Sequence, residues 1–226
     1  MSNNEQPKFF NEVVLPHAKG QETGYPEELL RHILHDLAGI HKGSFMDLGG
    51  GWGAHTKIAM HLGFDAVSLD REAAADDVPH LICNIAKERF PFDDNHFDVI
   101  FSKSVIEHFY TFELPHLMAE IIRVLKPGGK VVFMTPDWDS NTRNFYKVFS
   151  HVTPYTRESL TQCLKMYGFE NVQTTKLIQL PSSWRSPFMA TLARLTAALP
   201  LPRSTSKWVR WSKEASLVGV GCKPQN

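Results

Sequence analysis

A glycine-rich stretch carries the clearest chemical signal in the sequence. Residues 47–53 read Asp-Leu-Gly-Gly-Gly-Trp-Gly and follow a short apolar run that begins at Phe45. Glycines between a strand and a helix permit positive backbone torsions and let a ligand approach main-chain N–H groups closely. The stretch therefore predicts a nucleotide-binding turn.

Two aspartates distinguish among the nucleotides that such a turn could bind. Asp47 directly precedes the glycines, where an acid is awkward beside pyrophosphate but suits a cofactor with an amino group and a sulfonium cation. Asp70 ends a second apolar run, 66–69, where a carboxylate can accept hydrogen bonds from both ribose hydroxyls. Either acid alone could be a helix cap or a solvated loop charge. Asp70 suits both kinds of nucleotide, whereas Asp47 ahead of the turn favours a sulfonium-bearing nucleoside over a dinucleotide.

Further stretches, in matching order along the chain, give the sequence a resemblance to the seven-stranded class I methyltransferases of the small-molecule type. Besides the glycine motif, these are residues 90–101 (FPFDDNHFDVIF), 104–108 (SVIEH) and 123–130 (RVLKPGGK). The resemblance runs from about Tyr25 to Phe169. It implies an α/β fold, in which helices cover both faces of a seven-stranded, mostly parallel sheet. It also implies S-adenosyl-L-methionine as the cofactor.

The resemblance implies which residues hold that cofactor. The glycines would line its methionine and ribose portions, with Asp47 near the amino group and Asp70 on the ribose. Asn84 would lie beside the adenine, at a position where the family usually has Asp, and its amide oxygen could still accept from the adenine amino group. Lys103 is expected to point outward or toward an anionic group of the acceptor, because a buried cation beside a sulfonium is unfavourable. The predicted cofactor-binding residues are Asp47, Gly49, Gly51, Gly53, Asp70, Asn84, Ile85 and Ser102.

Three residues are candidates for the acceptor site. His108 follows the fourth predicted strand, and histidine titrates near neutral pH, so it could take the proton from a hydroxyl acceptor. The alternative is that His108 merely packs at the start of a helix. His151 and Tyr155 belong to a segment that resembles a stretch in methyltransferases of polysaccharide and natural-product gene clusters. Capping of a helix by Thr156 accounts for part of that pattern.

The Glu107-His108 pair is similar to one in the ubiquinone-pathway O-methyltransferases, where a further Glu, three residues earlier, helps hold a divalent metal. Ser104 stands at that position here, and no His-Glu-x-x-His spacing replaces it. We therefore expect no metal site.

Composition bounds the class of protein. With 226 residues and 42% hydrophobic content, the chain can bury one substantial core, so one domain is expected. Its 24 basic and 24 acidic residues balance, which leaves no global field to attract nucleic acid. Three cysteines without a Cys-x-x-Cys pair argue against disulfides. Without a signal peptide or a membrane-spanning run, a cytoplasmic protein is expected, soluble or at most peripheral to a membrane.

Alternating apolar runs and helical patterns supply the elements that must position these residues. Helices are expected at about 26–37, 54–62, 114–125 and 156–167. Strands are expected at 45–48, 66–69, 80–83, 97–101, 130–134, 172–180 and 215–222. A Pro-Gly-Gly turn, 127–129, precedes the fifth strand. This alternation predicts a parallel sheet with helices on both faces.

The segment 181–213 is atypical, because it holds six basic residues, three tryptophans and no acid. Ser186 and Pro187 predict the start of a helix. Its apolar stripe consists of Trp184, Phe188, Leu192, Leu195 and Leu199. The stripe must be covered, either by the domain's own core or a dimer mate, or by an anionic membrane or a lipid-linked acceptor. Binding of nucleic acid is the weaker option.

These patterns predict an enzyme that transfers a methyl group from S-adenosyl-L-methionine to a small-molecule acceptor, at a hydroxyl of a sugar, glycolipid or natural product. A monomer or homodimer is expected. Two alternatives stay open: a catalytically silent scaffold that keeps the cofactor pocket, and an NAD-linked dehydrogenase, which Asp47 fits poorly. The single domain is expected to comprise a helical cap (1–43), a cofactor-binding core (44–180), the basic insert (181–213) and a last strand (214–226).

Overall fold

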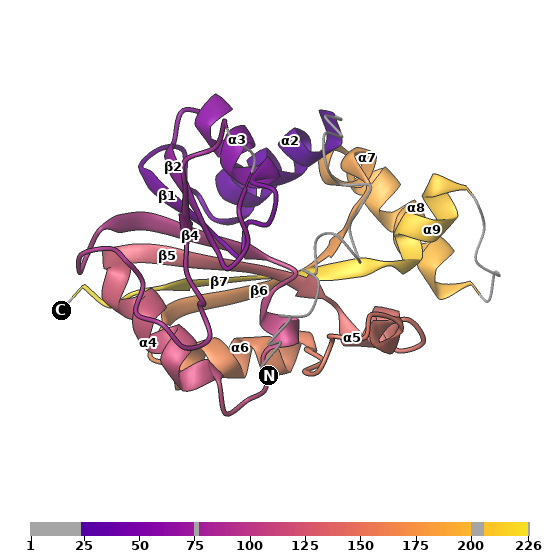
Figure 1. Cartoon of the computed structure of the whole chain (residues 1–226). Coiled ribbons are helices and arrows are strands. Elements are labelled where there is room, and N and C mark those ends of the chain that lie inside the picture. The colour runs from indigo at the N-terminus through magenta and orange to yellow at the C-terminus, as the bar shows by residue number, and fades with distance from the viewer. Residues whose placement is uncertain (1–23, 75–76, 200–205, 226) are drawn as a thin grey trace, which may run out of the picture.

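A computed structural model describes residues 24–74, 77–199 and 206–225. Its centre is a seven-stranded sheet in the order β3-β2-β1-β4-β5-β7-β6 (Figure 1). Among the described strands, β7 alone runs in the direction opposite to the other six. The strands are β1 (Ser44–Leu48), β2 (Asp65–Asp70), β3 (His80–Ile82), β4 (Phe97–Lys103), β5 (Leu125–Pro136), β6 (Glu170–Ile178) and β7 (Ala215–Cys222). The predicted α/β fold with a mostly parallel sheet is confirmed.

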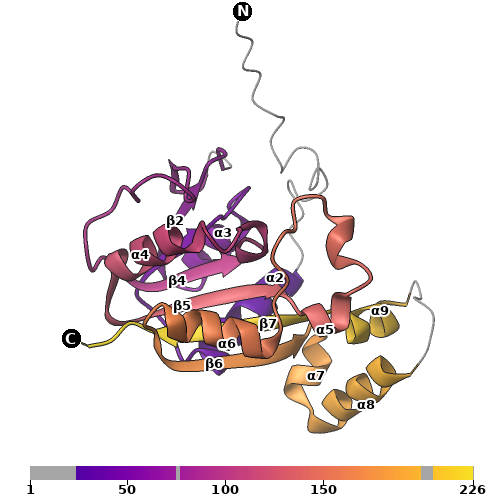
Figure 2. The same ribbon diagram turned by 90° about the horizontal axis from the view of Figure 1, so that it is seen from below.

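Helices cover both faces of the sheet, as Figures 1 and 2 show. One layer holds α2 (Gly24–Arg31), the π-helical η1 (His32–Leu37) and α3 (Ala54–His61), and the other holds α4 (Leu114–Val124) and α6 (Arg157–Met166). Successive strand residues enter opposite layers, because side chains alternate along a strand. Phe45 of β1 is buried with Leu30 of α2, whereas Met46 is buried with Leu117 of α4. The core therefore occupies both faces of the sheet, and the ends of the strands are left for a site.

Most predicted elements are confirmed to within two residues, and two differences have a physical reason. The Pro-Gly-Gly turn lies inside β5, where Phe97 pairs with Leu125 and Val99 with Lys130. The residues between form a bulge in which Gly128 has a φ of 75°. β6 begins and ends two residues before the predicted 172–180, because its pairing with β7 sets its bounds.

Three helices between β6 and β7 form the predicted insert: α7 (Pro181–Arg185), α8 (Pro187–Ala198) and α9 (Lys207–Lys213). Ser186 caps α8 as predicted, since its Oγ accepts from the Met189 N–H. Arg203, and the first 23 residues of the predicted cap, lie outside the described residues. No described helix has both the length and the apolar character needed to cross a membrane.

Only the first member of the apolar stripe, Trp184, packs against the domain's own core, and the rest of the stripe does not, which corrects that alternative for α8. Ala193 and Thr196 form the buried side of this helix, and the Trp208 indole N–H of α9 donates to the Thr196 hydroxyl at 3.2 Å. Trp184, in α7, stacks on His32 at 4.5 Å between ring centroids. The four remaining members of the stripe, all exposed, are Phe188, Leu192, Leu195 and Leu199.

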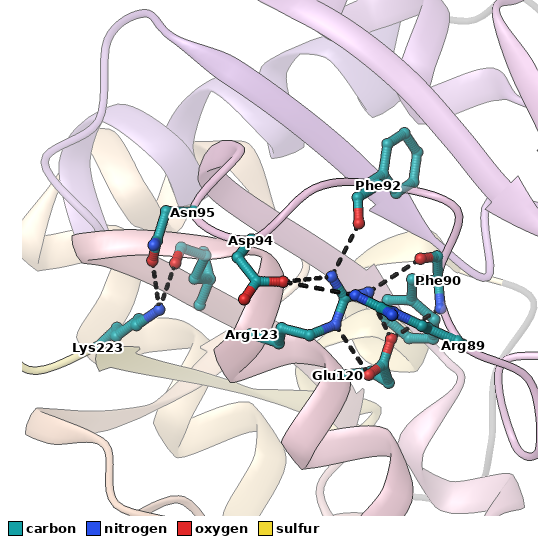
Figure 3. A network of polar contacts seen from close by, with 9 residues as sticks. Arg89, Phe90, Phe92, Asp94, Asn95, Glu120, Arg123 and Lys223 are labelled. Carbon is teal, nitrogen blue, oxygen red and sulfur yellow. Dashed lines mark hydrogen bonds and ion pairs between the residues drawn. The ribbon is translucent and has the colours of Figure 1, made fainter.

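A polar network fastens the loop before β4 to α4 (Figure 3). At its centre, the Arg123 guanidinium donates five hydrogen bonds of 2.7–3.0 Å. The acceptors are the carbonyl oxygens of Phe90 and Phe92 and the carboxylates of Asp94 and Glu120. These carboxylates hold the pKa of Arg123 above its ordinary value. Residues from two of the stretches that resemble the family, 90–101 and 123–130, therefore hold the start of β4 in place.

We expect Arg123→Ala to lower the free energy of unfolding by about 3 kcal/mol, because two carbonyl oxygens and the half-buried Glu120 lose a charged donor. Urea denaturation followed by circular dichroism measures the change. Arg89→Ala is the matched control, since this exposed guanidinium approaches Asp94 only to 3.8 Å. It should cost less than about 0.5 kcal/mol. Equal losses in the two variants would contradict the structural role of Arg123.

Candidate active site

The predicted nucleotide-binding turn joins β1 to α3. Gly49, Gly51 and Gly53 have φ angles of 74°, 54° and 80°, in the left-handed region that favours glycine. A Cβ at Gly49 would lie 2.5 Å from the Val105 side chain, and one at Gly53 would lie 2.8 Å from Val78. Both torsion and packing therefore require glycine here, and they leave a cradle of bare main chain at the end of β1.

Asp47 lies beneath this turn and is almost fully buried. Its Oδ2 accepts a 2.8 Å hydrogen bond from the Thr56 hydroxyl of α3. Burial raises the pKa of the Asp47 carboxyl to about 7, with a further contribution from the charge of Asp70 and an opposing one from the Thr56 hydrogen bond. A Cβ at Gly50 would lie 2.8 Å from this carboxyl group. Asp47 thus connects the strand, the turn and the helix.

Asp70 closes the turn from the end of β2. Its two carboxylate oxygens accept from the Gly51 N–H at 2.9 Å and from the Glu72 N–H at 3.0 Å. The Gly49 N–H is bound separately, to the Leu69 carbonyl oxygen at 2.8 Å. Because each carboxylate oxygen offers two lone pairs, Asp70 keeps acceptor capacity for a ligand hydroxyl. The structure therefore brings Asp47, Asp70 and the glycines together.

The other predicted cofactor residues have mainly local partners. Ser102, fully buried in β4, donates its hydroxyl to the Leu48 carbonyl oxygen at 2.9 Å, which ties the ends of β4 and β1 together. The Asn84 side-chain oxygen accepts from the Ala86 N–H at 3.2 Å. Ile85 packs, partly buried, against the cluster on the α4 side of the sheet. Asn84 and Ile85 follow β3, and so lie beyond Asp70 along the same edge.

A second group of ionisable side chains follows β4 at this edge. The chain leaves the strand through Ser104, which has a φ of 57°, and enters the short helix η2 (Ile106–His108). Glu107 of this helix is completely buried, and its Oε2 accepts from the Thr135 hydroxyl at 3.0 Å. The Oε1 atom has no hydrogen-bond partner among the described residues and lies 4.0 Å from the His151 Nε2. Burial raises the pKa of Glu107 to about 7.

The two predicted histidines stand side by side, with ring centroids 4.8 Å apart. The His108 Nδ1 lies 3.0 Å from the Ser150 carbonyl oxygen, and burial lowers the pKa of His108 to about 4. Burial also lowers the pKa of His151. Both rings are therefore neutral near pH 7. The Glu107 carbonyl oxygen accepts from the N–H groups of Val152 and Thr153, which holds the His151 loop against η2.

Tyr155 and Lys103 border this group. Tyr155 is buried in the core cluster, its hydroxyl lacks a partner among the described residues, and burial raises its pKa. Lys103 is half-buried and not fully exposed: burial lowers its pKa, and the charges of Asp47 and Glu107 oppose that shift. Two nearby carboxyl groups thus offset part of the cost of burying an ammonium group. The other expectation, that it faces an anionic group of the acceptor, stays a prediction.

Glu107 is the site residue that sequence reasoning assigned no role of its own. The sequence pattern presents Glu107 only as half of a pair, with His108, that is similar to a metal-binding pair. The available signal was an acid directly after two apolar residues, Val105 and Ile106, a few residues beyond the strand predicted at 97–101. Ligand atoms of Glu107, His108 and His151 lie within 4.8 Å of one another. The expectation of no metal site stays a prediction.

The chain matches the family model described as "Methyltransferase domain" over residues 23–174. This stretch includes the glycine turn and both histidines. The chain belongs to the class I S-adenosylmethionine-dependent methyltransferases. A solved S-adenosylmethionine-dependent methyltransferase from Archaeoglobus fulgidus superposes on this methyltransferase with a TM-score of 0.64 and 17% identity, covering 87% of this chain and 94% of that one.

Two curated relatives match shorter stretches of the methyltransferase. An uncharacterized protein of Methanocaldococcus jannaschii is 27% identical over 160 residues, which cover 67% of this chain and 73% of that protein. A sterol 4-C-methyltransferase of Caenorhabditis elegans is 36% identical over 69 residues, 29% of this chain. The latter match spans 20% of that relative's length. Similarity therefore identifies the family and S-adenosyl-L-methionine as the cofactor, and it leaves the acceptor open.

The raised pKa of Glu107 predicts a pH-dependent stability of the methyltransferase. The folded state binds this proton more tightly than an exposed carboxyl with its ordinary pKa of 4.5, so stability falls as pH rises from about 4.5 to 7. The unfolding free energy of the wild type relative to Glu107→Gln should decline by about 3 kcal/mol across this window. Urea titrations at several pH values measure it. Glu170→Gln, at an exposed glutamate, is the control, and a pH-independent difference for Glu107→Gln would contradict the burial argument.

Proposed function

We propose that this methyltransferase transfers the methyl group of S-adenosylmethionine to a hydroxyl oxygen of a small-molecule acceptor, such as a sugar, glycolipid or natural product. The observation that carries the proposal is the pair of His151 and buried Glu107, at the sheet edge that also holds the glycine turn. A hydroxyl loses a proton when it is methylated. A neutral histidine beside a carboxyl group can accept that proton.

The cofactor supplies a methyl group that is already activated, because it sits on a positively charged sulfur. The protein's own task is mainly to orient the acceptor, and orientation can contribute about 7–11 kcal/mol to lowering a barrier. We assign the cradle to Gly49, Gly51 and Gly53, where a Cβ would collide with neighbours or strain the backbone. Asp70 would accept from the ribose hydroxyls.

The remaining predicted cofactor residues are assigned secondary roles. Asp47 would face the cofactor's amino group across the turn, and a cation there would favour its ionised form. Asn84 and Ile85 would border the adenine, and Ser102 would present its backbone to the methionine portion. Each assignment follows the family resemblance and agrees with the position of the residue on the carboxyl edge of the sheet.

In the acceptor site, His151 is proposed as the general base and Glu107 as its orienting partner. Proton uptake would turn His151 into a cation, and an ionised Glu107 at 4.0 Å would stabilise that charge. His108, whose Nδ1 is held by the Ser150 carbonyl oxygen, would shape the opposite wall of the site. Tyr155 would keep its phenol neutral behind the pair, since burial raises its pKa.

Cofactor binding can be tested without knowing the acceptor. Asp70→Asn should weaken the affinity for S-adenosylhomocysteine by about tenfold or more in calorimetric titration, because it removes a charged acceptor for the ribose hydroxyls. Asp65→Asn, at the exposed opposite end of β2, is the matched control and should bind like the wild type. If the wild type shows no heat at millimolar ligand, the cofactor assignment fails.

The acceptor class can be tested with S-adenosylmethionine labelled in its methyl group and panels of sugars, glycolipids and phenolic compounds. Mass spectrometry should locate the label on oxygen. With the acceptor so found, His151→Ala should lower kcat/KM by about 10²–10⁴-fold, while His61→Ala, at an exposed site on α3, should not. EDTA should leave the rate unchanged. Transfer to nitrogen or carbon, or full activity of His151→Ala, would refute the proposal.

A further inference from the structure

An apolar side of α8 is exposed. Phe188, Leu192, Leu195 and Leu199 follow helical spacing and therefore line one side of the helix. Their side chains are 74%, 41%, 60% and 51% exposed. Three large exposed apolar residues on a 12-residue helix, with a fourth at its C-cap, exceed the scattered exposure usual for a protein surface. No described residue of this chain buries this side.

The same pair of helices, α8 and α9, carries exposed cations, and the segment 181–213 contains no acidic residue to pair with them. Arg194 of α8 and Lys207 and Arg210 of α9 are exposed. Lys207 and Arg210 both lie over the Trp211 ring, 5.9 Å from its centroid. The segment 181–213 contains no Asp or Glu, although the whole chain balances its charges. We call these three cations and the four apolar residues of α8 the α8–α9 surface.

The insert is attached to the body of the protein through α7, which directly precedes α8. Besides the stacking of Trp184 on His32, the Arg185 guanidinium donates to Glu28 of α2 at 2.8 Å. The insert leaves the sheet after β6 and returns at β7, whose first residues pair with the end of β5. It therefore projects at the carboxyl edge of the parallel strands (Figure 1). The glycine turn after β1 and the short helix η2 after β4, which holds Glu107, lie at the same edge.

We propose that the α8–α9 surface binds an anionic lipid bilayer. An amphipathic helix lies in a membrane interface with its apolar side among the lipids and its cations at the headgroups. Negative headgroups supply the counter-charge that the segment lacks. A second copy of this chain is a poorer occupant, because a two-fold contact would gather the cations of both copies in one interface without an acid of the segment to pair with them. This inference does not depend on the acceptor or on methyl transfer.

Flotation of the full chain with vesicles tests the proposal. The protein should float with vesicles of phosphatidylglycerol and phosphatidylcholine and stay at the bottom with phosphatidylcholine alone. Binding should weaken as salt screens the headgroups. Each basic residue near a bilayer contributes about fivefold in affinity, so Arg194→Gln/Lys207→Gln/Arg210→Gln should weaken partitioning on the order of 100-fold. Failure to float with the anionic vesicles would overturn the proposal.

The apolar contribution needs a separate comparison. Phe188→Gln/Leu195→Gln should reduce binding at least tenfold, because both side chains would leave the lipid. Phe112→Gln is the matched control, since Phe112 is 75% exposed and lies before α4, outside the insert. Unchanged thermal unfolding would show that the variants fold. If the wild type instead self-associates in sedimentation runs without lipid and Phe188→Gln/Leu195→Gln does not, the surface is a dimer contact and the proposal is wrong.

Discussion

The pairing of β1 with β4 is the constraint on which the site depends. Because the two strands are parallel neighbours, the turn after β1 and the chain after β4 emerge at one edge of the sheet. The Ser102 hydroxyl bonds the Leu48 carbonyl oxygen and fixes the two ends to each other. Val105 then packs so closely on Gly49 that a Cβ would have no room. This contact sets the positions of both the glycine turn and the group around Glu107.

The contact between the ends of β1 and β4 also brings several ionisable groups together in a buried environment. Asp47 and Glu107 have raised pKa values and Lys103 a lowered one, and burial is the main cause in all three. Each charge there is costly alone and less costly beside its opposite. A buried, partly compensated set of charges is sensitive to an arriving ligand, since a cationic cofactor changes the balance. This is the physical reason to place the chemistry at this edge.

The insert between β6 and β7 adds a group of three helices beside the sheet. The helix α8 does not extend the core, because its buried side chains are the small Ala193 and Thr196, whereas Phe188, Leu192 and Leu195 are exposed. Stacking and an ion pair with the first helices nevertheless hold the insert beside the site edge. The enzyme thus combines a methyltransferase core with a surface whose composition differs from that of the rest of the chain.

The sequence alone determined the order of strands and helices, the glycine turn with Asp47 and Asp70, and through these the family, since such features depend on residues close together in the chain. It also placed His108 and His151 among the candidates. Only the tertiary structure showed that the buried Glu107 lies beside them, that Lys103 is half-buried, and that most of the apolar stripe of α8 is exposed. These depend on packing between segments far apart in sequence, where burial and neighbouring charges are set by contacts that local patterns do not encode.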